Sequence, residues 1–219
     1  MNQSLFKNLV VQKKWGNERE VFYNGTISLW LLQIHPGHST SMHAHMNKRT
    51  GLVMVGGLAT LSFMYQSHRI EPLDKYNIHP RSFHKTVAHK FTTLLEVEAP
   101  PNKTDLVRMA DDYGRAGMPY EAGPYEPKSP SFRDLESHGQ HVRFDECLVD
   151  YDWFRDDHAN DNNDVLIIAS GGLITPEQVQ IVYPGDILWS SQLKKLLSMA
   201  EAIPLTEVIR VVKIGGPKL

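Results

Sequence analysis

Residues 20–98 are a succession of short apolar or alternating runs, each about the length of a β-strand. Examples are residues 27–34 (ISLWLLQI), 58–65 (LATLSFMY) and 91–97 (FTTLLEV). Turn-forming residues interrupt them at His35-Pro36-Gly37 and at Gly56-Gly57. Many short strands at this spacing predict an all-β sandwich or barrel.

The pattern changes after this region. Residues 111–141 are rich in Gly, Pro, Ser and charged residues and predict a long irregular connection. A second apolar region covers 165–188, and residues 208–214 (VIRVVKI) have the composition of a terminal strand. Between them, residues 192–202 have apolar positions at helical spacing, and Pro204 is expected to end that helix.

The two apolar regions also resemble each other. VMVGGLATL followed by IEPLDKYNI parallels IIASGGLIT followed by IVYPGDILW. Each has a strand, a Gly-Gly turn, a second strand and a Pro-x-Asp turn, which indicates an internal repeat. We therefore expect a barrel at 15–115, an irregular connection at 116–142, and a C-terminal lobe at 143–219 that is a partial second barrel if the repeat is real.

Composition narrows the classes of function. The 219 residues have a formal net charge of −2, so no general basic field exists to hold nucleic acid or an anionic membrane. No apolar run is long enough to cross a bilayer, and the first residues lack the apolar stretch of a signal peptide. Cys147 is the single cysteine. These features predict a cytoplasmic protein without an intrachain disulfide.

Histidine is the unusual residue, because eight of the eleven lie between His35 and His89. His43 and His45 are two positions apart, so on a strand both imidazoles point to the same face. His84 follows a turn-like segment, opens a strand and is the best candidate for a third ligand. Neutral imidazole is a common ligand of zinc, iron and nickel, and this trio predicts a site for one divalent metal ion.

The spacing around these histidines resembles the first motif of the cupin superfamily, G-x5-H-x-H-x3-4-E-x6-G. Gly37, His43, His45, Thr50 and Gly57 stand at the corresponding positions. Residues 79–84 (HPRSFH) match the second motif, P-x-G-x-x-H, more loosely. The resemblance implies an RmlC-like jelly-roll barrel. Thr50 replaces the glutamate ligand, which leaves three imidazoles and favours Fe(II), Zn or Ni over Mg or Ca.

Two further segments resemble cupins of sugar-phosphate and nucleotide-sugar pathways: residues 14–18 (KWGNE) and 108–115 (RMADDYGR). This resemblance implies carbohydrate metabolism and a small anionic or polyhydroxyl substrate. Basic residues next to the histidines in sequence could hold such a ligand, or could form a solvated rim. The substrate-binding candidates are Lys48, Arg49, Arg81 and Lys85, and the candidates for a catalytic base are His79 and Tyr76.

Three functions remain open at this point. The first is a metal-dependent isomerase or epimerase acting on a sugar or sugar phosphate. The second is an Fe(II) oxygenase with a three-histidine site, and the third is a non-catalytic binding module. Exposed sheet edges need covering, so we also expect a homodimer unless the C-terminal lobe supplies that cover.

Overall fold

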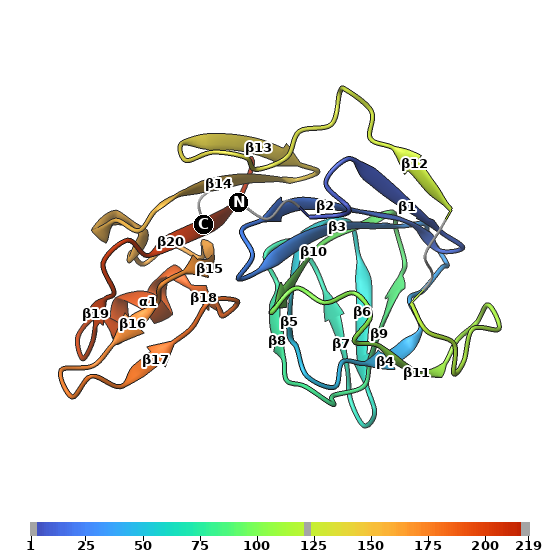
Figure 1. Ribbon diagram of the computed structural model, residues 1–219, viewed down its shortest axis with the longest axis horizontal. Helices are drawn as coiled ribbons and strands as arrows, with labels where there is room; N and C mark the ends of the chain where they lie inside the picture. The colour runs from blue at the N-terminus through green and yellow to red at the C-terminus, as the bar shows by residue number, and fades with distance from the viewer. Residues whose placement is uncertain (1–3, 121–123, 216–219) are drawn as a thin grey trace.

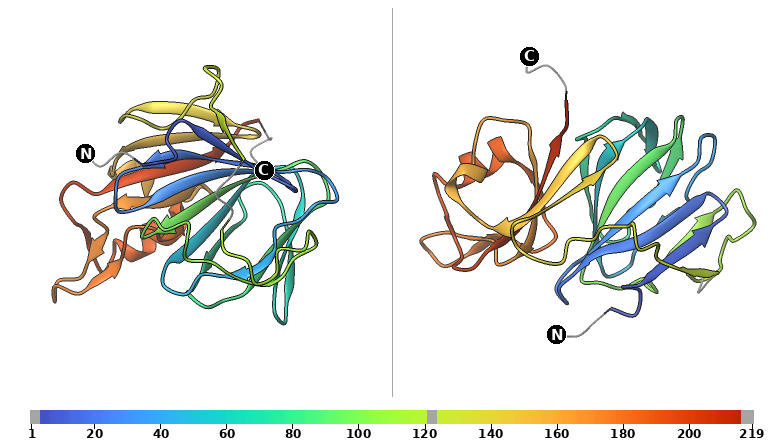
Figure 2. Two further views of the ribbon diagram at one scale, coloured as in Figure 1. Left: turned by 45° about the vertical axis from the view of Figure 1, so that its right-hand side comes forward. Right: turned by 90° about the horizontal axis from the view of Figure 1, so that it is seen from above.

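The computed structural model describes residues 4–120 and 124–215, which form two β lobes side by side (Figures 1 and 2). The strands of the N-terminal lobe are β1 (Leu9–Lys13), β2 (Gly16–Tyr23), β3 (Ser28–Ile34), β4 (Met42–Ala44), β5 (Arg49–Gly56), β6 (Ala59–Phe63), β7 (Ser67–Ile70), β8 (Lys75–Ile78), β9 (His84–Ala88), β10 (Thr92–Ala99), β11 (Val107–Ala110) and β12 (Tyr125–Pro127). The predicted all-β fold class is confirmed.

The N-terminal lobe is a jelly-roll barrel, the fold that the motif resemblance implied. One antiparallel sheet has the order β12-β1-β2-β3-β10-β5-β8, and the second has the order β11-β4-β9-β6-β7. Side chains from both sheets meet in one apolar core, with Trp30 and Leu94 from the first sheet and Leu61 and Ala88 from the second.

The C-terminal lobe is built in the same way with fewer strands. Its elements are β13 (Gln140–Phe144), β14 (Cys147–Trp153), the 3₁₀ helix η1 (Asp156–His158), β15 (Val165–Ser170), β16 (Leu173–Ile174), β17 (Gln180–Val182), β18 (Ile187–Trp189), α1 (Ser190–Leu196), β19 (Glu201–Ala202) and β20 (Glu207–Lys213). The order β13-β14-β20-β15-β18 matches β2-β3-β10-β5-β8, and β17-β16-β19 matches β7-β6-β9. The short helix η1 stands where the first lobe has β4.

The repeat extends to single hydrogen bonds. In the first lobe, Oδ2 of Asp74 accepts the N–H of Glu71 at 2.8 Å, and in the second, Oδ2 of Asp186 accepts the N–H of Tyr183 at 2.8 Å. The residue before each aspartate has a positive φ, 79° in the first turn and 90° in the second. Both Pro-x-Asp turns therefore have the same structure, and each leads into a strand that pairs with the strand before the Gly-Gly turn.

The two lobes share a large apolar core. The outward-facing residues of β3, β5 and β10 pack against the sheet of the C-terminal lobe, with Leu29, Val53 and Val97 among the buried side chains. Gly51 lets the lobes approach closely, because a Cβ at this position would lie 2.2 Å from Cδ1 of Ile187. The C-terminal lobe thus covers the outer face of the first sheet. The oligomeric state remains a prediction.

Two boundaries differ from the sequence-based expectation. The segment 116–142, which was expected to be irregular, contains β12 and the first residues of β13. β12 pairs with β1 through its backbone, and its exposed side chains give no alternating pattern that would have predicted a strand. The helix expected at 192–202 is shorter, because β19 uses residues 201–202 to pair with β16. Within the described residues, no helix is long and apolar enough to cross a membrane.

Candidate metal centre

His43, His45 and His84 come together at the open end of the N-terminal barrel. His43 lies on β4 and pairs directly with His84 at the start of β9, while His45 directly follows β4. The ring centroids are 4.3 Å apart for His43 and His84, 5.1 Å for His43 and His45, and 5.5 Å for His45 and His84. One nitrogen from each ring lies within 4.8 Å of the others.

Each of these imidazoles is held by its Nδ1 atom. The Nδ1 atoms donate to backbone carbonyl oxygens: His43 to Ser41 at 2.8 Å, His45 to Asp105 at 2.7 Å and His84 to Ser82 at 3.0 Å. This arrangement assigns the lone pair to Nε2 in all three rings, the pattern by which proteins orient metal-ligating histidines.

The Nε2 atoms of His45 and His84 are buried and accept no hydrogen bond from any described residue. Buried acceptors without a partner are costly, and a cation satisfies them. Nitrogens that each lie about 2.1 Å from one ion are roughly 3–3.5 Å apart, and the three candidate nitrogens already lie within 4.8 Å of one another. The donor set therefore fits a divalent metal that accepts imidazole.

Burial also keeps these histidines neutral. Desolvation lowers the pKa of His43 well below its ordinary value, that of His45 to about 3 and that of His84 to about 4. The positive charge of Lys48 contributes to each shift, as a smaller cause. At neutral pH all three rings are therefore in the form that binds metal.

Asp105 fixes the loop that carries His45. Its carboxylate accepts the backbone N–H groups of Met46, Asn47 and Lys48 at 2.8–2.9 Å, while its carbonyl oxygen accepts the Nδ1 hydrogen of His45. Desolvation is the largest single effect on the pKa of Asp105 and raises it, but the three backbone hydrogen bonds together with His45 outweigh desolvation, so this pKa is lowered. Sequence reasoning missed this residue, because Asp105 lies about sixty positions from the loop that it orders.

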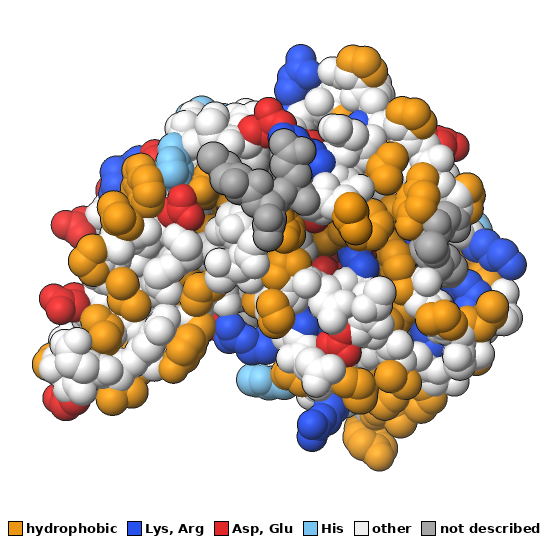
Figure 3. Space-filling model, viewed as in Figure 1, with side chains coloured by type: hydrophobic (Ala, Val, Ile, Leu, Met, Phe, Trp, Pro, Cys, Tyr) orange, Lys and Arg blue, Asp and Glu red, His pale blue; other side chains and the backbone are white. Residues whose placement is uncertain are grey.

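His43 and His45 border a cavity of about 60 Å³ inside the barrel, and His84 contacts His43 from the neighbouring strand. Among the described residues, five basic and three acidic side chains line it: Lys13, Lys48, Lys103, Arg108, Arg115, Glu18, Glu96 and Glu98. The segment between β10 and β11, which carries Lys103, crosses in front of the barrel in Figure 1. In the same view, Figure 3 shows basic and acidic side chains in a hollow of this face. The site therefore combines candidate metal ligands with buried charge.

Lys103 is the centre of the buried charge. Its Nζ lies 3.2 Å from Glu98, 3.6 Å from Glu96 and 3.8 Å from Glu18, and it also lies 3.9 Å from the ring centroid of Trp30. The three carboxylates raise the pKa of Lys103 despite its burial. The signal for this cluster was present in the sequence, since Glu96 and Glu98 are two positions apart in the apolar strand FTTLLEVEA and must share one face.

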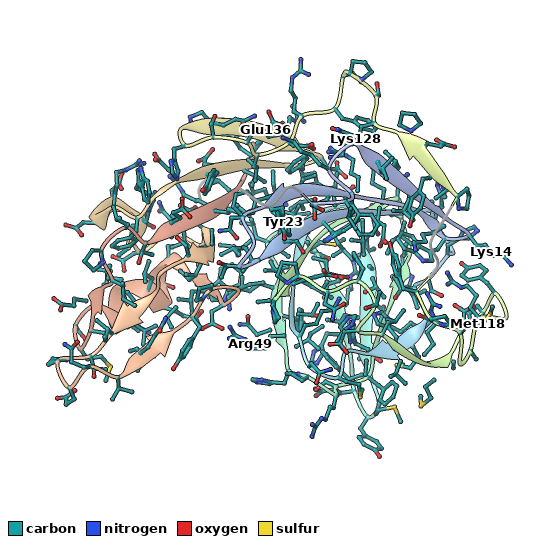
Figure 4. All side chains as sticks on the ribbon, viewed as in Figure 1. Lys14, Tyr23, Arg49, Met118, Lys128 and Glu136 are labelled. Atoms are coloured by element: carbon teal, nitrogen blue, oxygen red, sulfur yellow. The ribbon has the colours of Figure 1, made fainter. Side chains whose placement is uncertain are left out.

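The structure distributes the predicted substrate-binding residues over different surfaces. Lys48 lines the cavity, and its Nζ lies 2.6 Å from Glu98. Arg49 instead binds Asp186 at 2.5 Å, and Figure 4 shows it at the junction of the lobes. Lys85 forms an ion pair with Asp112 at 2.6 Å, and Arg81 is exposed. Lys85 follows His84 on β9, so alternation turns its side chain to the opposite face of that strand.

The predicted catalytic candidates also lie away from the cavity. His79 is exposed after β8, and Tyr76 packs with Phe63 and His68. Neither is among the described residues that line the cavity. Thr50, at the position of the missing glutamate, lies opposite Glu98 in the pairing of β5 with β10, and its Oγ1 is buried without a hydrogen-bond partner in the described structure.

Comparisons with known proteins add only a likeness of fold. No protein-family model matches the sequence, and no curated protein matches it. Among solved structures, KdgF from Halomonas sp. is 13% identical and has a TM-score of 0.38, over 46% of this chain and 87% of that one. A protein from Planctomyces limnophilus is 23% identical (TM-score 0.40; 48% and 96% covered). Rru_A2000 from Rhodospirillum rubrum, a cupin-2 domain, is 16% identical (TM-score 0.39; 48% and 82%).

Proposed function

We propose that this chain is a metal-dependent isomerase or epimerase that acts on an anionic sugar or sugar phosphate. The observation that carries this proposal is the arrangement of one cavity. His43 and His45 line it together with carboxylates and an excess of basic side chains, and the buried Nε2 of His45 has no hydrogen-bond partner among the described residues. That combination suits proton transfer next to a polarised carbonyl group in an oxygen-rich anion.

Different residues would bind the metal ion and the substrate. His43, His45 and His84 would hold one Fe, Zn or Ni ion, which would act as a Lewis acid on the carbonyl oxygen of the substrate. Lys48 and Arg108 line the cavity and provide positive charge for a phosphate or carboxylate. A cavity of about 60 Å³ holds on the order of four water molecules, so it accepts the carbonyl end of an open-chain sugar rather than a ring.

The test begins with metal analysis of natively purified protein. The protein is then incubated in D₂O with each of a panel of aldose and ketose phosphates, with Fe(II), Zn or Ni added. We expect about one metal ion per chain, and loss of the proton NMR signal of the carbon next to the carbonyl. Retention of that signal for every sugar with every metal would refute the isomerase proposal.

An Fe(II) oxygenase is the second candidate. The observation that favours it is that the ligand set has three neutral imidazoles, with Thr50 in place of a carboxylate. Oxygen consumption that requires both added iron and an organic acid would support this activity. Replacement of all three histidines by alanine separates both enzymes from a non-catalytic binding module, because only the module would keep its biological activity.

A further inference from the structure

The three carboxylates in the cavity differ in how firmly they are held. Glu98 has three partners: Nζ of Lys48 at 2.6 Å, Nζ of Lys103 at 3.2 Å, and the hydroxyl of Ser28, which donates at 3.2 Å. These cations lower the pKa of Glu98 well below its ordinary value, although burial opposes them. Glu98 is therefore a fixed anion, and it orients the two lysines.

Glu18 is also held by a hydrogen bond and by ion pairs. The hydroxyl of Tyr120 donates a short hydrogen bond to it, and Nζ of Lys13 lies 3.5 Å away. Lys103 adds a weaker contact at 3.8 Å. The pKa of Glu18 is lowered by these two lysines and the tyrosine, against the opposing effect of burial. A carboxylate bound in this way is poorly suited to accept a further proton.

Glu96 is the exception. Among the described residues its one ion-pair partner is Lys103, at 3.6 Å, which is also shared with the other two carboxylates. Glu96 lines the same cavity as His43 and His45, and its side chain is 9% exposed. Burial raises its pKa, and the negative charge of Glu98 adds to that shift, against the effect of Lys103.

We infer that Glu96 is the acid–base residue of the proposed isomerase. This inference rests on the proposed function and names the group that moves the proton. The Glu96 carboxylate takes a proton from the carbon next to the carbonyl group. The C–H bond breaks, its electron pair forms a carbon–carbon double bond, and negative charge moves to the carbonyl oxygen. Glu96 then returns the proton to the former carbonyl carbon, while the hydroxyl proton on the first carbon passes to the former carbonyl oxygen. The C=O bond thereby moves by one carbon, and no oxidant or reductant is needed.

The surroundings of Glu96 support this role. Its neighbours across the sheet are Trp30 on β3 and Leu52 on β5, both buried, which keep bulk water away from one side of the carboxyl group. A base with a pKa raised toward the working pH transfers protons most effectively. Lys103 remains close enough to stabilise the ionised form between the two proton transfers.

The experiment compares Glu96→Gln with wild type for deuterium incorporation from D₂O into the same sugar phosphates, with zinc bound. We expect the exchange rate to fall by about 100-fold or more, the usual contribution of a positioned acid–base group. Glu20→Gln is the matched control. Glu20 is also buried on a strand, burial raises its pKa to about 7, and it does not line this cavity. Its exchange rate should match wild type.

Two further measurements distinguish a base from a structural group. Zinc affinity of Glu96→Gln should stay within about threefold of wild type, because Glu96 is not a proposed ligand; a large loss of affinity would overturn the assignment. In Glu96→Ala, added formate should restore exchange in a saturable way, whereas no rescue would count against a proton-transfer role.

The outcomes separate the two proposals. If wild-type protein exchanges deuterium and Glu96→Gln does so at a similar rate, the role of Glu96 is refuted and the isomerase stands. If wild-type protein shows no exchange with any metal, the proposed function fails, and the role of Glu96 fails with it.

Discussion

Replacing Lys103 with methionine removes the cation at the centre of the cavity while keeping most of the side-chain volume. The methionine can still cover the ring of Trp30, which Nζ of Lys103 approaches to 3.9 Å. What is lost is the positive charge that Glu18, Glu96 and Glu98 share. The variant therefore isolates the electrostatic contribution of one buried charge.

The expected loss is large, because all four side chains are at least nine-tenths buried. Removing one partner from a buried ion pair costs roughly 3–5 kcal/mol, since the remaining charge stays buried without compensation. For a chain of this size, each kcal/mol lowers the melting temperature by about 2–4 °C, so we expect a decrease of roughly 6–20 °C at pH 8.

The loss should shrink as the pH falls. In wild type, the folded-state pKa of Glu18 and of Glu98 lies below the ordinary 4.5, so their stabilisation is present above that pH and is lost below it. The folded-state pKa of Lys103 is raised, so its contribution is present below its ordinary 10.5 and is lost at higher pH. Without Lys103 the carboxyl pKa values rise in the folded state, and protonation between pH 8 and pH 5 relieves the repulsion.

Calorimetric unfolding of both proteins at pH 5, 6, 7 and 8 measures this difference. Lys194→Met is the matched control, because Lys194 pairs with Asp161 at the surface, and an exposed pair contributes about 0–1 kcal/mol. A Lys103→Met variant that loses less than about 1 kcal/mol would refute this account of the cavity. So would one whose loss is the same at pH 5 and pH 8.

Three other predictions concern the site and the lobes. His84→Ala should reduce zinc affinity by at least about 100-fold in calorimetric titration. His79 is exposed, so His79→Ala should bind zinc as wild type does, and equal losses in the two variants would contradict zinc binding by the trio. Thr50→Val should raise stability by about 1 kcal/mol in urea unfolding, because the buried Oγ1 has no hydrogen-bond partner in the described structure; destabilisation would show that the hydroxyl is used. Gly51→Ala should cost about 1–3 kcal/mol in urea unfolding, because its Cβ would overlap Ile187; a neutral result would mean that the lobes separate easily.

The strands and the histidine trio could be predicted because both depend on local patterns. Alternation identified the barrel strands, and the H-x-H spacing placed His43 and His45 together. The third histidine of the trio, His84, was predicted because it follows a turn-like segment and opens a strand. The repeated Gly-Gly and Pro-x-Asp turns also carried enough signal to indicate the second lobe.

Strand alternation places Glu96 and Glu98 on one face, but it could not predict which cations compensate them. A lysine or glutamate is usually exposed, so Lys103 and Glu96 were not selected as site residues. Only the folded structure shows that their opposite charges are paired. Basic residues next to the histidines in sequence were predicted to bind substrate, but closeness in sequence does not place a side chain in the cavity. Arg49 is adjacent to Thr50 in the chain, yet it binds Asp186 in the other lobe.

The packing of the second lobe against β3, β5 and β10 has a consequence for assembly. Jelly-roll sheets with an apolar outer face need a covering surface, and a separate subunit provides one only above its dissociation constant. Here the covering sheet is tethered to the face that it covers, and a short tether corresponds to an effective concentration on the order of millimolar. The outer face of β3, β5 and β10 therefore stays covered at any dilution of the protein.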